Sequence, residues 1–242
     1  LADNDPSTLK EDRWVVCISR GVGAYVGILA CVLSGKPFIP VDPLRSNAIN
    51  LEIIKKVNPS KIFFDPSDSA SQRFLNWLSQ EYRDRKIKIV EAGNLPLSAF
   101  GVQEGTEIVS LTSFADDPAY IMFTSGSTGF PKGVEILNRN ILSYLNMCKG
   151  YLRLVDYETY SQTFSLAFDF SVHDLWNCWG HSGHLIVASS KDLLDPKSYF
   201  SQHSFNNVAL VPTLARRLFS DELSLKLDLS SVRNTVFGGE AL

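Results

Sequence analysis

Short apolar runs rich in β-branched residues alternate with segments of helical spacing, and this alternation restricts the fold more than any other feature of the chain. In the first 90 residues, strand-like runs at 14–18, 37–41, 61–64 and 87–90 enclose helix-like segments at 23–33, 48–57 and 71–85. A β-α-β order of this kind predicts a largely parallel sheet with helices packed against it.

The run at residues 37–41 differs from the other strand-like runs because it contains Pro37 and Pro40. Proline has no amide hydrogen to give to a strand ladder. We therefore expect this strand at a sheet edge, or with limited pairing.

A second set of alternating segments follows residue 117. We expect strands at 120–124, 134–136, 160–164, 185–188, 208–211 and 235–237, and helices at 139–152, from 171 and at 213–219. Residues 91–117 have weak periodicity and many polar side chains, which predicts a connecting segment. The expected fold class is therefore α/β, with two αβ subdomains at 1–116 and 117–242 whose largely parallel sheets are flanked by helices.

The bulk composition excludes several function classes. The chain has 242 residues, of which 45% are hydrophobic and 20% charged, and its net charge is -3. These values are ordinary for a globular protein and give no basic footprint for nucleic acid or for an anionic membrane. The apolar run at residues 22–33 is too short to span a bilayer. Four widely spaced cysteines form no CxxC pair, which favours neither a zinc ribbon nor a redox motif. Cysteines spaced in this way suit a reducing cytoplasm.

The two ends of the sequence also carry an expectation. The chain begins without an initiator methionine and shows no signal peptide, and it stops just after a strand-like run. We expect it to be a piece of a longer protein.

A loop with three glycines, four hydroxyl residues and one lysine follows the apolar strand expected at 120–124. Glycines let the backbone approach a ligand closely, successive free N–H groups form an anion site, and lysine adds a charge suited to phosphate. The loop predicts polyphosphate binding rather than an ordinary solvent loop. The candidate phosphate-binding residues are Thr124, Ser125, Gly126, Ser127, Thr128, Gly129 and Lys132.

This loop is neither of the two common nucleotide-binding motifs. A P-loop needs Gly-Lys-Ser/Thr opening a helix, whereas Lys132 precedes Gly133 and the chain then returns to a strand-like run. A GxGxxG pattern after a strand is also absent, which argues against a dinucleotide fold.

Residues 124–133 resemble the signature loop of the adenylate-forming superfamily, which includes acyl-CoA synthetases, luciferases and the adenylation domains of nonribosomal peptide synthetases. Four further blocks, at 35–43, 117–120, 168–171 and 237–242, resemble other motifs of this family in the expected order. The resemblance covers nearly the whole chain. It implies part of the N-terminal core domain, without the mobile C-terminal domain.

The resemblance implies a reaction. A carboxylate would attack the α-phosphorus of ATP, release pyrophosphate and form an acyl-adenylate, which a carrier-protein phosphopantetheine thiol would then accept. ATP and Mg²⁺ are the implied cofactors. Residues 124–132 would hold the β- and γ-phosphates, and Gly238, Gly239 and Glu240 would approach the adenine side. The family's Mg²⁺-binding Glu, ribose-binding Asp and catalytic Lys have no counterpart here, so we expect this chain alone to be inactive or nearly so.

One position departs from the family pattern. Relatives often have a histidine about five residues after the Lys-Gly pair, and here Asn138 or Arg139 holds that place. A helper role for that histidine therefore cannot be transferred to this chain.

Asp169 precedes a segment that we expect to be helical, and two roles are open to it. It could cap the helix, where Ser171 and Asp174 also have the spacing of a capping box. The resemblance instead implies that Asp169 pairs with the α-ammonium of an amino acid. It also implies a side-chain pocket suited to a small, cyclic or flat group. The residues implied to line this pocket are Phe170, His173, Ala209, Val236 and Gly238.

Several alternatives stay open. The enzyme could be an acyl- or aryl-CoA synthetase, or the chain could be a non-catalytic nucleotide-binding module. An amino-acid enzyme could be a free-standing ligase or one module of a larger synthetase. We expect no metal site at His173, His181 and His184, because no carboxylate or thiol lies at ligand spacing around the loop that holds two of them.

Overall fold

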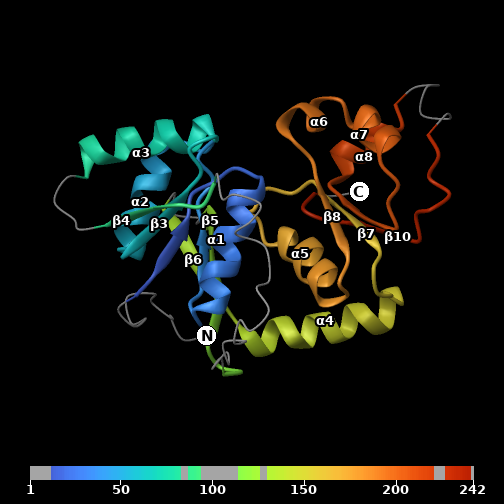
Figure 1. The fold of residues 1–242 in the computed structure, drawn as a ribbon, viewed down its shortest axis with the longest axis horizontal. Coiled ribbons are helices and arrows are strands. Elements are labelled where there is room, and N and C mark those ends of the chain that lie inside the picture. The colour runs from blue at the N-terminus through green and yellow to red at the C-terminus, as the bar shows by residue number, and fades with distance from the viewer. Residues whose placement is uncertain (1–11, 83–86, 94–113, 126–129, 221–226, 241–242) are drawn as a thin grey trace, which may run out of the picture. The chain divides into compact units, whose positions relative to one another are not determined.

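The computed structural model describes residues 12–82, 87–93, 114–125, 130–220 and 227–240 (Figure 1). The chain divides into two compact units, Leu1–Ile141 and Leu142–Leu242, and each is built around its own sheet. The expected α/β class, with helices flanking two sheets, is confirmed. No helix among these residues has the length and apolar character needed to cross a membrane.

The first unit contains a six-stranded sheet with the order β4-β3-β1-β2-β5-β6. All neighbouring strands are parallel except β5 and β6, which form an antiparallel pair. The strands are β1 (Trp14–Val16), β2 (Phe38–Pro40), β3 (Lys61–Phe64), β4 (Lys88–Glu91), β5 (Pro118–Ser125) and β6 (Pro131–Leu137). Helices α1 (Val22–Leu33), α2 (Asn47–Val57) and α3 (Ser69–Glu81) connect the first four strands.

Apolar side chains from the sheet and from α2 and α3 form the core of this unit. Ile39, Ile54 and Ile62 are fully buried, and Phe74 and Leu78 of α3 pack against the same cluster. The sheet side of α3 thus matches the helical spacing of its sequence.

Strand β2 lies inside the sheet, between β1 and β5. Its pairing with β5 consists of one register position, Phe38 opposite Tyr120. Of the two consequences expected from its prolines, limited pairing is observed and an edge position is not. The amide-free nitrogen of Pro40 leaves one side of this strand short of donors, which accounts for the short ladder.

The division between units lies later than the expected boundary after residue 116. Strand β5 pairs with β2, and β6 pairs with β5, so both join the first sheet. Helix α4 (Asn138–Leu152) crosses the division, which falls between Ile141 and Leu142. Most of the expected connecting segment, residues 94–113, lies outside the described residues.

The second unit contains a four-stranded parallel sheet with the order β10-β9-β7-β8. The strands are β7 (Thr159–Gln162), β8 (His184–Val187), β9 (Asn207–Leu210) and β10 (Asn234–Phe237). Helix α5 (Phe170–Gly180) packs against β7 and β8. Two helices that were not expected from the sequence, α6 (Ser190–Leu194) and α7 (Pro196–Gln202), precede β9, and α8 (Pro212–Leu218) follows it.

Side chains of β9 alternate between the two faces of this sheet. Val208 and Leu210 pack into a cluster with α7 and α8 that includes Tyr199, Phe200 and Leu214. Ala209 must therefore point to the opposite face, since successive strand residues face opposite ways. This alternation separates an apolar core from the face that carries the predicted pocket residues.

Candidate functional site

The two ends of the predicted phosphate loop are joined by the β5–β6 hairpin. Ser125 is opposite Pro131, and Thr124 is opposite Lys132, whose side chain is exposed. The Thr124 hydroxyl donates to the Lys132 carbonyl oxygen at 3.5 Å. The structure thus brings Thr124 and Lys132 together at one end of the sheet, while Gly126, Ser127, Thr128 and Gly129 lie outside the described residues.

Asp169 stands directly before α5, but its side chain does not cap the helix. The carboxylate is exposed, and its residue has right-handed helical backbone angles, with φ -61° and ψ -25°. No capping hydrogen bond therefore accounts for its position at the helix start. The carboxylate remains available for a ligand.

The capping box predicted from Ser171 and Asp174 is not formed. Helix α5 begins at Phe170, so Ser171 lies inside its first turn rather than before it. Both side chains are buried, and Ser171 Oγ and Asp174 Oδ2 make no hydrogen bond within the described part of the chain. Burial also raises the pKa of Asp174 well above its ordinary value, which favours the neutral acid.

Phe170 packs closely against Gly238, which follows β10. A Cβ atom at Gly238 would come within 2.4 Å of Phe170 Cε2, so the ring occupies the space that a side chain would need. Val236 lies two residues earlier and therefore points to the same face of the sheet. Ala209 is its register partner on β9 and shares that face. Four of the predicted pocket residues thus meet on one side of the second sheet.

His173 lies one turn after Asp169 and joins this group through Phe170. The two ring centroids are 5.5 Å apart. The Tyr144 hydroxyl lies 2.8 Å from His173 Nδ1, and Asn177 Nδ2 lies 3.2 Å from the same nitrogen. Burial lowers the pKa of His173 to about 4, so the imidazole is neutral near pH 7. Neither Tyr144 nor Asn177 was expected at the site from the sequence.

The segment after β10 turns sharply at Gly239, where φ is +89°, a value that favours glycine. A Cβ atom there would lie 3.2 Å from the Phe168 ring. The Glu240 carboxylate accepts hydrogen bonds from the Thr213 hydroxyl and, at 3.1 Å, from the Thr213 amide. These bonds lower the pKa of Glu240. The predicted adenine-side residues thus form a fixed connection between β10 and the start of α8.

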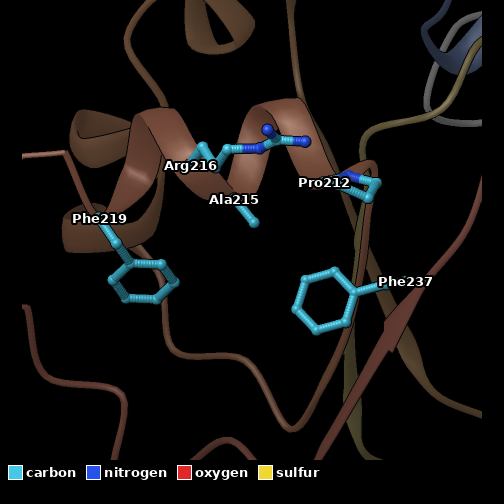
Figure 2. Close-up of a pocket in the computed structure, with 5 residues that line it drawn as sticks. All are labelled: Pro212, Ala215, Arg216, Phe219 and Phe237. Atoms are coloured by element: carbon cyan, nitrogen blue, oxygen red, sulfur yellow. The ribbon is translucent and has the colours of Figure 1, made fainter. Parts of the chain in front are cut away.

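An apolar pocket of about 460 Å³ lies beside α8 (Figure 2). Phe237 points into it, on the sheet face opposite to Val236 and Gly238, as strand alternation requires. The pocket is therefore separate from the group around Phe170. Its lining residues are Pro212, Ala215, Arg216, Phe219 and Phe237.

The other two histidines considered as metal ligands, His181 and His184, lie at the end of α5 and at the start of β8. His181 Nδ1 lies 2.9 Å from the Asn177 carbonyl oxygen, and His184 begins β8 with an exposed side chain. In the part of the chain that the structure describes, no group of three His, Cys, Asp or Glu residues could hold a metal ion.

Comparison with known proteins gives a consistent set of matches. A family described as AMP-binding enzyme matches residues 8–242. A D-alanine–D-alanyl carrier protein ligase of Bacillus licheniformis is 31% identical over 222 residues, which cover 90% of this chain and 41% of the ligase. Malpinin synthetase of Mortierella alpina is 27% identical over 238 residues, which cover 97% of this chain and 3% of the synthetase.

The fold also matches a solved structure. The Vibrio cholerae adenylation domain AlmE, in complex with glycyl-adenosine-5'-phosphate, superposes with a TM-score of 0.69 at 22% identity, covering 86% of this chain and 42% of AlmE. At this identity the match shows the fold alone. This chain spans less than half the length of each of these three proteins.

Proposed function

Since the chain belongs to the family of AMP-binding enzymes, as its match over residues 8–242 shows, we propose that it forms part of the core of an amino-acid adenylation enzyme. The enzyme would activate the carboxylate of an amino acid with ATP and release pyrophosphate. It would then pass the aminoacyl group to the phosphopantetheine thiol of a carrier protein and release AMP. Three relatives support this proposal: a carrier protein ligase, a synthetase and a structure with glycyl-adenosine-5'-phosphate.

The observation that carries the amino-acid assignment is the free carboxylate of Asp169. It makes no capping hydrogen bond, it is exposed, and it directly precedes Phe170 of the gathered group. A carboxylate held at this place can form a charge-assisted hydrogen bond with a substrate ammonium. A fatty or aryl acid would give it no partner.

In the proposed reaction, an oxygen of the substrate carboxylate forms a bond to the α-phosphorus of ATP. The bond between that phosphorus and its bridging oxygen to the β-phosphate breaks, and pyrophosphate leaves with the electron pair. This step needs positioning and charge neutralisation rather than a protein nucleophile. Thr124 and Lys132, which pair across the β5–β6 hairpin, would hold the β- and γ-phosphates together with residues 125–129. Gly238, Gly239 and Glu240 would line the adenine side.

Mg²⁺ is expected to accompany ATP. The described residues do not fit a metal site of their own, since they contain no cluster of three suitable side chains. We therefore assign no ligand and no step to Mg²⁺. We also propose that the 242-residue chain by itself lacks adenylation activity, because it spans less than half of its relatives.

The proposal is tested by amino-acid-dependent ATP–pyrophosphate exchange, screened against the amino acids with a longer protein that contains these residues. Asp169→Asn should lower exchange roughly tenfold to a hundredfold, because a hydrogen bond to a charged group contributes about 1.5 to 3 kcal/mol. Its unfolding free energy should stay unchanged, since Asp169 caps nothing.

Three outcomes would contradict parts of the proposal. Equal use of the matching acid without an α-amine would point to an acyl- or aryl-CoA synthetase. ATP binding without exchange for any acid would point to a nucleotide-binding module. Measurable exchange by the 242-residue chain would overturn the proposed inactivity of this piece.

A further inference from the structure

His173 is held from one side, through its Nδ1 atom. Tyr144, on α4, places its hydroxyl oxygen 2.8 Å from this nitrogen, and Asn177, one turn further along α5, places Nδ2 at 3.2 Å. Asn177 is fully buried and His173 is 6% exposed, so their contact lies away from bulk water, whereas the contact with Tyr144 is partly buried. The ring nitrogen that carries the proton determines whether His173 Nε2, on the other side of the ring, is a hydrogen-bond donor or an acceptor.

The orientation of the Asn177 amide determines that proton's position. Asn177 Nδ2 lies 2.8 Å from the His173 carbonyl oxygen, which can only accept a hydrogen bond. The atom facing this carbonyl must therefore be the amide nitrogen. Its second hydrogen points to His173 Nδ1, so Nδ1 must carry a lone pair, and the Tyr144 hydroxyl donates to the same lone pair. The proton of the neutral ring then resides on Nε2.

His181 provides a contrast on the same helix. Its Nδ1 lies 2.9 Å from the Asn177 carbonyl oxygen, so Nδ1 must carry the hydrogen and donate it. The two histidines, eight positions apart, are therefore expected to be opposite neutral tautomers. This difference follows from their hydrogen-bond partners and not from any difference in their ordinary chemistry.

The Nε2–H group of His173 has no hydrogen-bond partner among the described residues, and it is not one of the fully buried polar atoms that lack a partner. It therefore keeps access to the space beside the ring. The neighbouring surface is the Phe170 ring, with centroids 5.5 Å apart, and that ring fills the space over Gly238. An apolar wall with one N–H donor can distinguish a side chain that bears an oxygen acceptor from a hydrocarbon of the same shape.

We propose that Tyr144 and Asn177 are positioning residues that hold His173 as its neutral Nε2–H tautomer, so that the pocket selects a small amino-acid side chain bearing an oxygen acceptor over its hydrocarbon isostere. This inference rests on the proposed amino-acid adenylation for its substrate arm. The tautomer arm rests only on the contacts of Tyr144, His173 and Asn177. The two arms are tested separately.

The tautomer arm is tested on the 242-residue chain by long-range ¹H–¹⁵N NMR with labelled histidine, which distinguishes the two neutral forms. His173→Gln assigns the His173 signal. We expect Nε2–H at His173 and Nδ1–H at His181, which serves as the internal control. Asn177→Asp replaces the donating amide by an accepting carboxylate and should shift His173 toward the Nδ1–H form. Nδ1–H at His173 in the unaltered chain would overturn the inference.

The substrate arm uses pyrophosphate exchange by the longer protein with two matched pairs, threonine with valine and serine with alanine. The hydroxyl member should be preferred by roughly threefold to tenfold, the effect of one net hydrogen bond. Tyr144→Phe removes one of the two donors to His173 Nδ1 and should lower the ratio, mainly through the KM for the hydroxyl substrate. The control is Tyr151→Phe on the same helix, whose side chain is 84% exposed and which should keep the ratio.

The outcomes separate the two proposals. No exchange with any amino acid would refute the proposed function, while the NMR result would still decide the tautomer arm. Exchange with equal use of both members of each pair would refute the proposed selectivity and leave the adenylation proposal standing. An unchanged ratio in Tyr144→Phe would refute the positioning role of Tyr144.

Discussion

Helices α3 and α5 both begin after an aspartate, yet they use it in different ways. In the first unit, Asp68 accepts hydrogen bonds from the amides of Ala70 at 3.0 Å and Ser19 at 2.8 Å, so it caps α3 and anchors a neighbouring loop. In the second unit, Asp169 caps nothing. The same residue type at the same local position thus stabilises one helix and is left available at the other.

The buried faces of these two helices also differ, in whether their polar groups have hydrogen-bond partners. Helix α3 buries Phe74 and Leu78, and its buried Ser71 hydroxyl donates to the Cys17 carbonyl oxygen at 2.5 Å. Helix α5 buries Asp174 and Asn177, each with an oxygen that makes no hydrogen bond to the described residues.

Burying a polar group without a partner costs free energy. A protein typically tolerates buried polar groups without partners at a functional element and not in the scaffold beside it. We infer that α3 is arranged for stability, whereas the arrangement of α5 is better explained by binding.

The largest expected effect tests the apolar side of this comparison. Phe74 is 1% exposed and stacks on Trp77 with ring centroids 6.1 Å apart. Phe74→Ala should lower the unfolding free energy by about 3 to 5 kcal/mol, through lost burial and the cavity that remains. Urea unfolding followed by tryptophan fluorescence measures it. The loss should be the same at pH 5 and pH 7, and a strong pH dependence would contradict a purely apolar role for α3.

The second largest expected effect concerns the buried polar face of α5 and is a pH dependence of stability that arises from His173. The folded pKa of His173, about 4, lies below its ordinary value of 6.5, so the folded state disfavours the protonated ring. The corresponding stability is present above about pH 6.5 and is lost as the pH falls toward 4, by about 3 kcal/mol in total.

This loss is best measured as the difference in unfolding free energy between the unaltered chain and His173→Gln at each pH. The raised pKa of Asp174 acts in the opposite direction and is common to both proteins. A difference that stays constant from pH 7 to pH 4 would show that the ring is not protected from protonation.

The smallest effect compares the two aspartates directly. Asp68→Ala should lower the unfolding free energy by about 1 kcal/mol, the usual contribution of a capping residue. Asp169→Ala should change it by less than about 0.5 kcal/mol, as for most surface substitutions. Chemical denaturation of both variants and the unaltered chain under one condition measures these changes in unfolding free energy. Equal losses would mean that Asp169 has a structural role, which would weaken the amino-acid assignment.

Much of the fold was predictable because its elements have strong local patterns. The strand at 61–64 was placed at its observed bounds, and helix α2 was placed to within one residue. Helix α6 was missed because 5 residues are too few for helical periodicity to show, and α7 was missed although α8, which also has 7 residues, was predicted. The extension of the first sheet by β5 and β6 was also missed, since it depends on a long-range pairing, Phe38 with Tyr120, that no local pattern encodes.

The candidate site was predictable only in part. Resemblance to a known family identified Asp169, Phe170 and His173, and the structure groups Phe170 and His173 with residues of β9 and β10. Asn177 carried a usable signal, since residues four apart on a helix are neighbours. Tyr144 carried none, because its contact with His173 links two helices through tertiary packing.

The antiparallel β5–β6 pair has a consequence for the order in which the chain folds. Among the described strands of its sheet, the other pairings are parallel and join segments separated by a whole helix or more, as for Trp14 with Lys61. Ser125 and Pro131, in contrast, need only a short turn to meet. A hairpin closes in about 1 to 10 μs, far faster than pairings of high contact order. We expect the two ends of the predicted phosphate loop to meet early in folding, before the long-range parts of the sheet assemble around them.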